Sequence, residues 1–421
     1  MSNTSRRDFL KTLSLGASLA PMATLTQVNT WLNDEWMAID FNAFEDFRSQ
    51  FMLSDEINYL NHASIGTIPK TIHKVHTEFL ALCETNPWLH MWGGAWEEPR
   101  EEVRRKAASF INAKPEEITI SHNTTEVFNL LGMGLPLGPG DEVLFSNLNH
   151  PGASVPFDYH SKRKGYKVVN CEIPIGKIEQ LSKDEIVDFH LRKVTPSTKL
   201  IVLPHIDNTV GLRTPINDIA AAARKKGVQW IAIDAAQTVG MIPVDVRELD
   251  IDVMATSAHK WIQAPKGVSV SYINEGMLDV LEPMWVTWGQ NRWKETARRY
   301  EDYGTRNLAA TLTMGASIDF QNNINQTERN KHLIKLRDFT MEVADKHPNA
   351  EWKSSRDWDL SGSLYAIGIK NEKASEFADR LFKDHGTIVR PFDAPELNSV
   401  RIAPNLMNTE EDVLKLFRQI K

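Results

Sequence analysis

The stretch Trp230-Ile231-Ala232-Ile233-Asp234-Ala235-Ala236-Gln237 is a short apolar run that ends on an acidic residue. A short apolar run bounded by polar residues predicts a strand that is buried on both faces. Similar runs recur between residues 115 and 275, and stretches with helical spacing separate them. Strands that alternate with helices imply βαβ units and a mostly parallel sheet covered on both sides. The predicted strands are Glu117–Ile120, Glu142–Ser146, Lys167–Ile173, Lys199–Pro204, Gln229–Ile233 and Val253–Ala255, with Gly267–Ile273 returning as an antiparallel seventh.

The composition describes a globular chain rather than a fibre or a disordered protein. The 421 residues include 48 Lys and Arg against 55 Asp and Glu, which gives a net charge of −7. This acidic excess argues against nucleic acid as the main partner, because a polyanion requires clustered cations. The two cysteines, Cys83 and Cys171, cannot build a disulfide framework, and the absence of CxxC or Cys/His spacing excludes a thiolate zinc site.

Two domains are predicted from the change of pattern along the chain. Residues 61–310 contain the alternating strands and helices, and we expect them to form a large α/β domain. Beyond about residue 310 the composition shifts to long charged helices with two or three strands. That part, residues 311–421, is expected to form a smaller α+β domain.

The N-terminal residues are expected to be separate from both domains. Residues 1–25 carry Arg6-Arg7 ahead of a short, mildly apolar run, which is the layout of a twin-arginine export signal. A frayed basic N-terminus is the alternative. The apolar run is too short to span a bilayer, so no membrane span is predicted. Because a twin-arginine signal directs export, a periplasmic location is expected. Residues 26–60 are expected to form a helical arm, because aromatic and acidic residues recur at helical spacing there.

Polar residues follow three of the predicted strands, where open parallel sheets bind their ligands. Ser121-His122-Asn123-Thr124-Thr125-Glu126 leads into a predicted helix, and its N–H groups and hydroxyls suit a phosphate. Ordinary N-capping by one of the threonines is the alternative. Asp234 ends a buried strand, so it requires a cation such as a protonated cofactor ring, a metal or an arginine, unless it caps a helix. Lys260 follows the next strand and could form a Schiff base with a carbonyl, although a lone lysine is more often a surface charge.

Together these residues resemble a known family. Ser257-Ala258-His259-Lys260 after Asp234-x-x-Gln237 is similar to the class-V aminotransferase family of fold-type I enzymes that use pyridoxal phosphate. The resemblance covers nearly all of the chain after about residue 55, and it implies a mostly parallel seven-stranded sheet with a smaller C-terminal domain. Residues 60–66 and Gly304-Thr305-Arg306-Asn307 resemble elements of the isopenicillin N epimerase-like branch. Val400-Arg401-Ile402 resembles the strand that supplies the family's carboxylate-binding arginine.

The resemblance implies which residues hold pyridoxal phosphate. Lys260 is expected to bind the cofactor as a Schiff base and to move protons at the substrate α carbon. Asp234 is expected to keep the ring nitrogen protonated. His150 is expected to stack on the ring, with a loop histidine that has no ligand as the alternative. The other expected contacts are Asn208 and Gln237 at the phenolic oxygen, Thr124, Thr125, Ser257 and His259 at the phosphate, and Thr305 at the phosphate of the neighbouring subunit.

The expected substrate is a small amino-acid-like molecule. Arg401 is expected to bind its α-carboxylate bidentately, with a surface ion pair as the alternative, and Asn61 and His62 come from the matching entrance loop. The family also implies a homodimer with active sites at the subunit interface. No metal is expected.

The absence of a cysteine ahead of Arg401 narrows the range of expected reactions. Residues 393–399, ahead of Arg401, contain no cysteine, so the persulfide chemistry of the family's cysteine desulfurase branch is disfavoured. We expect an enzyme that resembles isopenicillin N epimerases; an aminotransferase or a cysteine-independent carbon–sulfur lyase is the alternative. A protein that keeps the fold without catalysis should lack the lysine or the aspartate, and a Rossmann oxidoreductase should carry GxGxxG after a strand, which none does.

Overall fold

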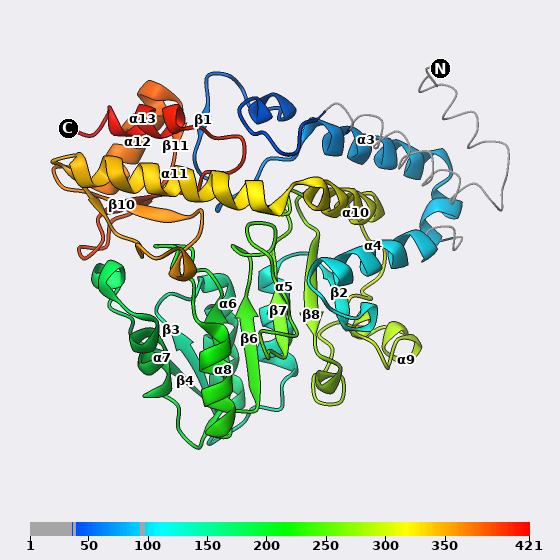
Figure 1. The fold of residues 1–421 in the computed structure, drawn as a ribbon. Coiled ribbons are helices and arrows are strands. Elements are labelled where there is room, and N and C mark those ends of the chain that lie inside the picture. The colour runs from blue at the N-terminus through cyan, green and yellow to red at the C-terminus, as the bar shows by residue number, and fades with distance from the viewer. Residues whose placement is uncertain (1–35, 37–38, 93–96) are drawn as a thin grey trace.

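The large domain is built on a seven-stranded sheet in which five neighbouring strands are parallel. The computed structural model describes Trp36, residues 39–92 and residues 97–421. The strand order is β2-β8-β7-β6-β5-β3-β4, and β8 runs antiparallel to both of its neighbours. The prediction of a mostly parallel seven-stranded sheet with an antiparallel return strand is therefore confirmed (Figure 1). The strands are β2 Ile118–Ser121, β3 Glu142–Ser146, β4 Lys167–Cys171, β5 Thr198–Pro204, β6 Trp230–Asp234, β7 Val253–Ala255 and β8 Ser269–Ile273.

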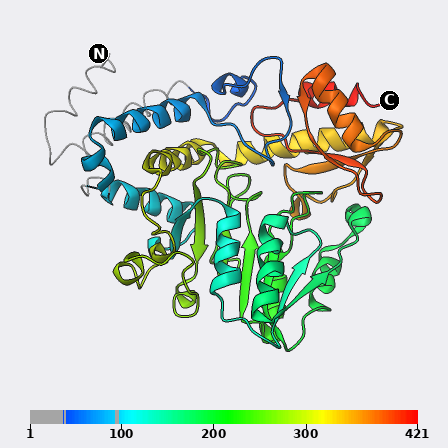
Figure 2. The ribbon, with the colours of Figure 1, turned by 180° about the vertical axis from the view of Figure 1, so that it is seen from behind.

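Helices cover both faces of this sheet, which explains why its central strands are buried on both sides. Alternate residues of a strand point to opposite faces, so Val143 and Phe145 join one core cluster while Leu144 joins the other. Figure 1 shows α8 on one face, and Figure 2, from behind, shows α5 and α6 on the other. The bounds of these helices are α5 Thr124–Gly134, α6 Pro151–Lys164, α7 Lys183–Leu191 and α8 Ile216–Lys225.

The C-terminal part contains a separate antiparallel sheet in the order β12-β13-β10-β9. Helices α11, α12 and α13 accompany it, and its buried side chains form a core cluster of their own. The predicted strand at 387–390 is divided, because residues 387–388 pair elsewhere. The elements are α11 Gln326–Lys346, β9 Ala350–Trp352, β10 Tyr365–Ile369, α12 Ala374–His385, β11 Thr387–Ile388, β12 Arg390–Phe392, β13 Ser399–Ile402 and α13 Glu410–Phe417.

A short segment near the N-terminus is paired with the C-terminal part. Strand β1 (Asn58–Tyr59) lies parallel to β11, and Asn61 forms an isolated bridge with Ala403. The Ala403 N–H donates to the Leu60 carbonyl at 2.7 Å. A few residues later, the Gly66 N–H donates to the His259 carbonyl at 2.9 Å, in the large domain.

Three helices outside the central sheet pack together. The helix α10 (Leu308–Asn323) packs against α3 (Lys70–Thr85) and α4 (Glu97–Phe110). The domain boundary predicted at residues 310 and 311 falls inside α10, so this helix belongs with the large domain. Shorter helical pieces are Phe47–Gln50, Trp88–Trp92, Pro115–Glu117, Ile175–Gln180, Glu275–Met277, α9 Gly289–Arg292, Ala297–Tyr300 and Trp358–Leu360.

The structure describes only part of the predicted N-terminal elements. The twin-arginine segment, residues 1–25, lies outside the described residues. Between residues 39 and 60 the predicted helical arm is present only as the 3-10 turn Phe47–Gln50. Phe47 and Phe51 are buried there, and the Phe47 ring lies 6.2 Å from that of Phe320 on α10. Where the chain is described, no helix has the length and apolar character needed to cross a bilayer.

Candidate active site

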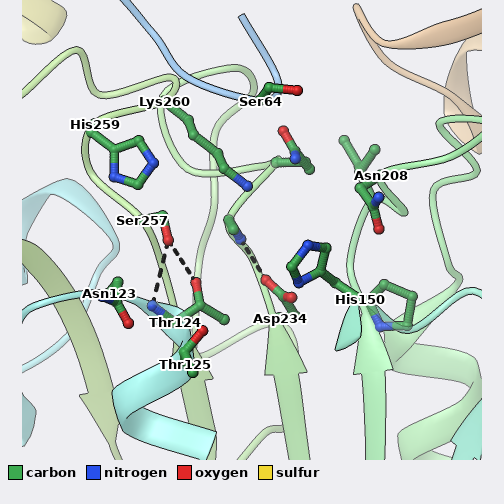
Figure 3. Close-up of a pocket in the computed structure, with 14 residues that line it drawn as sticks. Ser64, Asn123, Thr124, Thr125, His150, Asn208, Asp234, Ser257, His259 and Lys260 are labelled. Carbon is green, nitrogen blue, oxygen red and sulfur yellow. Dashed lines mark hydrogen bonds between the residues drawn. The ribbon is translucent and has the colours of Figure 1, made fainter. Parts of the chain in front are cut away.

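A cavity of about 290 Å3 lies at the carboxyl ends of the central strands, where the sequence predicted a site. Nine predicted residues from five separate stretches of chain line it together (Figure 3). They are Thr124, Thr125, His150, Asn208, Asp234, Gln237, Ser257, His259 and Lys260. Five more lining residues were not predicted, namely Ser64, Asn123, Pro204, Ile206 and Ala236.

The turn between β2 and α5 forms an anion cradle. Asn123 is the N-cap of α5, since its side chain accepts from the Glu126 N–H at 3.1 Å. The alternative that a threonine caps this helix is therefore wrong, and the Thr124 and Thr125 hydroxyls are not used for capping. The Thr124 Oγ1 lies 2.9 Å from the Ser257 Oγ, which draws the turns after β2 and β7 together. The Thr124 N–H also donates to the Ser257 hydroxyl at 3.4 Å, and N–H groups at a helix start together with such hydroxyls suit a phosphate.

Asp234 is buried at the end of β6 and faces the cavity. Its Oδ1 accepts from the Ala236 N–H at 3.0 Å, and no helix begins there, so it is not a helix cap. Burial raises the pKa of this carboxyl, while the positive charge of Lys260 acts in the opposite direction. A buried carboxylate of this kind favours a cationic partner in the cavity.

Lys260 enters the cavity from the turn after β7. In Figure 3 its side chain extends toward the middle of the cavity, with Asp234 and His150 on the opposite side. Burial lowers the pKa of Lys260 to about 8, although Asp234 opposes the shift. Near pH 8 half of the amine is therefore the neutral base, which is the form that attacks a carbonyl.

His150 keeps its predicted place in spite of the neighbouring Pro151. It is the N-cap of α6, and Pro151 occupies the first helical position. Proline fits there because the N–H that it lacks would have no partner within the helix. The His150 Nδ1 accepts from the Gly152 N–H at 3.0 Å. Burial and then Lys260 lower the pKa of His150, so a neutral ring faces the cavity. His150 therefore lines the cavity, and its stacking on the cofactor ring stays a prediction.

Arg401 on β13 lies at the edge of the cavity and is almost completely buried. Its guanidinium donates to the Asn208 carbonyl at 2.8 Å, and to the Asn61 Oδ1 and Ser64 Oγ at 2.6 Å each. All three acceptors are neutral, and its Nε has no partner. Burial, aided by the charge of Arg390, lowers the pKa of Arg401 to about 9. The alternative of a surface ion pair is therefore wrong, and a carboxylate would stabilise this charge.

Four predicted residues do not line the cavity: Arg401, which contacts the lining residues Asn208 and Ser64, and three others. His62 is completely buried, and its ring centre lies 6.0 Å from that of Trp261, so it supports the wall from behind. Asn61 reaches the site only through its hydrogen bond to Arg401. Thr305 is exposed and lines a different cavity, whose walls include Arg100, Arg298 and Arg306. Within one chain Thr305 therefore does not reach the candidate site.

Gly66 fixes the entrance loop against the turn that carries Lys260. A Cβ at Gly66 would lie 2.4 Å from the Lys260 carbonyl oxygen and 2.6 Å from that of His259. We expect Gly66→Ala to lower the stability by about 1–3 kcal/mol through overpacking and to displace Lys260. Thermal unfolding checks the first effect, and cofactor affinity checks the second. Gly138→Ala is the matched control, because a Cβ there meets nothing within 4 Å; equal effects of the two changes would contradict this account.

Comparison with known proteins shows which family this chain resembles. The family model described as "Aminotransferase class-V" matches residues 58–413. Isopenicillin N epimerase from Amycolatopsis lactamdurans is 26% identical over 403 residues, which cover 90% of this chain and 98% of that protein. A probable cysteine desulfurase from Pyrococcus abyssi is also 26% identical, over 82% of this chain and 86% of that protein.

Solved structures show the same fold. The cystine C–S lyase C-DES, in complex with its product cysteine persulfide, superposes with a TM-score of 0.79 at 20% identity, covering 87% of this chain and 97% of that chain. The cysteine desulfurase from Thermococcus onnurineus NA1 gives a TM-score of 0.78 at 24% identity, with coverages of 89% and 96%. At these identities the likeness establishes the fold-type I architecture predicted from sequence.

Proposed function

This chain belongs to the class-V aminotransferase family, and from that premise we propose that it is an enzyme acting at the α carbon of an amino-acid-like substrate, as an epimerase. The family supports the predicted cofactor, pyridoxal phosphate. The observation that carries the proposal is the cavity in which the Lys260 amine lies opposite the buried Asp234 carboxylate and beside the anion cradle of α5.

The residues present fit pyridoxal phosphate. Thr124, Thr125 and Ser257 would hold the phosphate at the start of α5. Asp234 would hold a protonated ring nitrogen, and the buried Lys260 amine would carry the cofactor covalently. When bound, the cofactor stabilises negative charge at the substrate α carbon.

The protein's side chains then transfer protons and orient the substrate. Lys260 has a pKa of about 8, so near neutral pH it accepts a proton from the substrate α carbon and returns it. A general base is most effective when its pKa lies near the working pH. Arg401 orients the α-carboxylate, since its planar fork suits bidentate binding. The neutral His150 ring offers a face for stacking on one side of the cavity. Epimerisation further requires that a proton reach the opposite face of the α carbon.

The cysteines support a reaction that does not use a thiol. Cys83 lies on α3, and Cys171 is buried at the end of β4, where burial raises its pKa to about 12. Neither lines the cavity, and the described residues 393–398 contain no cysteine. This favours an epimerase over a cysteine desulfurase, although both kinds of protein are relatives.

Assembly and location belong to the same proposal. Thr305 lies in an exposed loop outside the site of its own chain, which is consistent with a homodimer in which it reaches the partner's phosphate. The twin-arginine motif at Arg6-Arg7 supports export of the folded holoprotein, and hence a periplasmic substrate.

Isotope exchange tests the proposed reaction. The holoenzyme is incubated in deuterated water with single L- and D-amino acids, and 2-aminoisobutyrate, which has no α hydrogen, is the control. We expect deuterium at the α carbon together with inverted configuration and no keto acid. Keto acid formation would indicate the aminotransferase alternative, and release of a sulfur leaving group would indicate the lyase. No exchange with any amino acid would contradict the proposal.

A further inference from the structure

Two arginines lie side by side on the sheet of the small domain. Strands β12 and β13 are antiparallel, and their register places Arg390 directly opposite Arg401. Directly opposed residues project to the same face of a sheet, with Cβ atoms about 4.5–5.5 Å apart. Arg401 turns toward the cavity, where it contacts Asn208 and Ser64. Arg390 therefore projects from the same face, and its charge acts on both Arg401 and the cavity-lining His150.

Arg390 differs from Arg401 in its surroundings. It is exposed and lies on the edge strand of its sheet. The hydrogen bonds and ion pairs of the described chain include none to its guanidinium. The acidic side chain closest to it in sequence, Asp393, accepts from the Ser375 N–H at 2.9 Å. An exposed guanidinium that has no partner beside a ligand cavity is available for an anion.

The charged groups around the cavity also indicate that Arg390 is available for an anion. Lys260, Arg401 and Arg390 all lie near His150, and their charges, after burial, lower its pKa. Of the carboxylates near these groups, Asp234 acts on His150, and Asp207, which acts on Arg401, accepts three backbone N–H groups at 2.5–2.9 Å. Neither carboxylate balances Arg390. The anion cradle at the start of α5 would hold the cofactor phosphate through Thr124 and Thr125.

A substrate with one carboxylate would occupy Arg401 alone. We propose that Arg390 binds a second anionic group on the substrate side chain, so that the enzyme acts on α-amino acids with an acidic side chain. This inference rests on the proposed function, because it takes Arg401 as the α-carboxylate site. It makes Arg390 a specificity-determining residue, and it assigns the substrate class.

Spectroscopic titration of the holoenzyme tests the inference without relying on turnover. Binding changes the visible absorption of the cofactor, so apparent dissociation constants can be measured for L-glutamate against L-glutamine and for L-2-aminoadipate against L-norleucine. We expect each acid to bind about tenfold more tightly than its neutral counterpart, as a charge-assisted hydrogen bond allows. Raising the ionic strength should reduce that ratio.

Variants locate the effect. In Arg390→Gln the acidic preference should fall to about one, whereas the dissociation constants of the neutral amino acids should change by less than about twofold. Arg390→Lys should keep part of the preference. Arg163→Gln, which removes an exposed arginine from α6, is the matched control and should change neither.

Each other outcome overturns the inference. Equal weakening of acidic and neutral ligands in Arg390→Gln would mean that Arg390 acts on the α-carboxylate or on the fold. No acidic preference in the unmodified enzyme would refute the substrate class while leaving the proposed function intact. Absence of the visible cofactor band would refute the proposed function itself, and the inference with it.

Discussion

Replacing Lys260 with alanine is expected to abolish covalent attachment of the cofactor and to lower activity by about four orders of magnitude. The side chain supplies both the bond to the cofactor and the base at the α carbon, and a positioned acid–base group alone contributes about 10²–10⁴-fold. Borohydride reduction followed by peptide mass spectrometry should place the cofactor on the peptide that contains Lys260 in the unmodified enzyme. The same treatment should leave the Lys260→Ala variant without labelled peptide.

Lys266→Ala is the matched control for this experiment. Lys266 lies six positions along the chain from Lys260 but is exposed, and it does not line the cavity. Its removal should leave the absorption band, the labelled peptide and the activity unchanged. A labelled peptide around Lys266, or an unchanged spectrum in Lys260→Ala, would refute the assignment of Lys260.

The second large effect is expected from Asp234→Asn, at about 10³-fold in activity, within the range for a group that stabilises developing charge. The amide cannot hold a proton on the ring nitrogen as a carboxylate can, so the α carbanion is less stabilised. Loss of the carboxylate also removes the interaction that raises the pKa of Lys260, so that pKa should fall below about 8. The pH dependence of cofactor capture by the apoprotein should then shift to lower pH.

A surface change of the same chemistry serves as the control. Asp188 is exposed on α7 and pairs with Arg192, so Asp188→Asn should alter neither activity nor the pH dependence. Circular dichroism should show the same helix content in both variants. Full activity in Asp234→Asn would contradict the role proposed for this carboxylate.

Local sequence patterns predicted the large domain well, for physical reasons. The strands β3 and β6 are buried on both faces, and their continuous apolar runs cannot be satisfied by an exposed strand. Residues at the carboxyl ends of parallel strands must gather at one edge of the sheet. Asp234, Ser257 and Lys260 therefore came together as predicted, although residue roles stay predictions until they are measured.

Contacts between distant segments were harder to predict. His62 resembles a site residue in sequence, but packing against Trp261 turns it away from the cavity. Arg390 became noticeable only through its register with Arg401, which depends on the pairing of two short strands. Ser64 lines the cavity because its loop lies against the turn of Lys260, and no local pattern encodes that approach. The described residues 39–60 of the predicted arm show the same limit, since they form only the 3-10 turn Phe47–Gln50, where Phe47 lies against Phe320 on α10.

The pairing of β1 with β11 has a mechanical consequence for the entrance. Residues 58–61 pair with residues of the small domain, while the Gly66 N–H donates to the turn that carries Lys260. Any rigid rotation of the small domain must therefore bend the chain within the few residues between these anchors, and Ser64 lies among them. Because Arg401 on the small domain also donates to the Ser64 hydroxyl, the position of the entrance loop and the orientation of the Arg401 guanidinium are coupled.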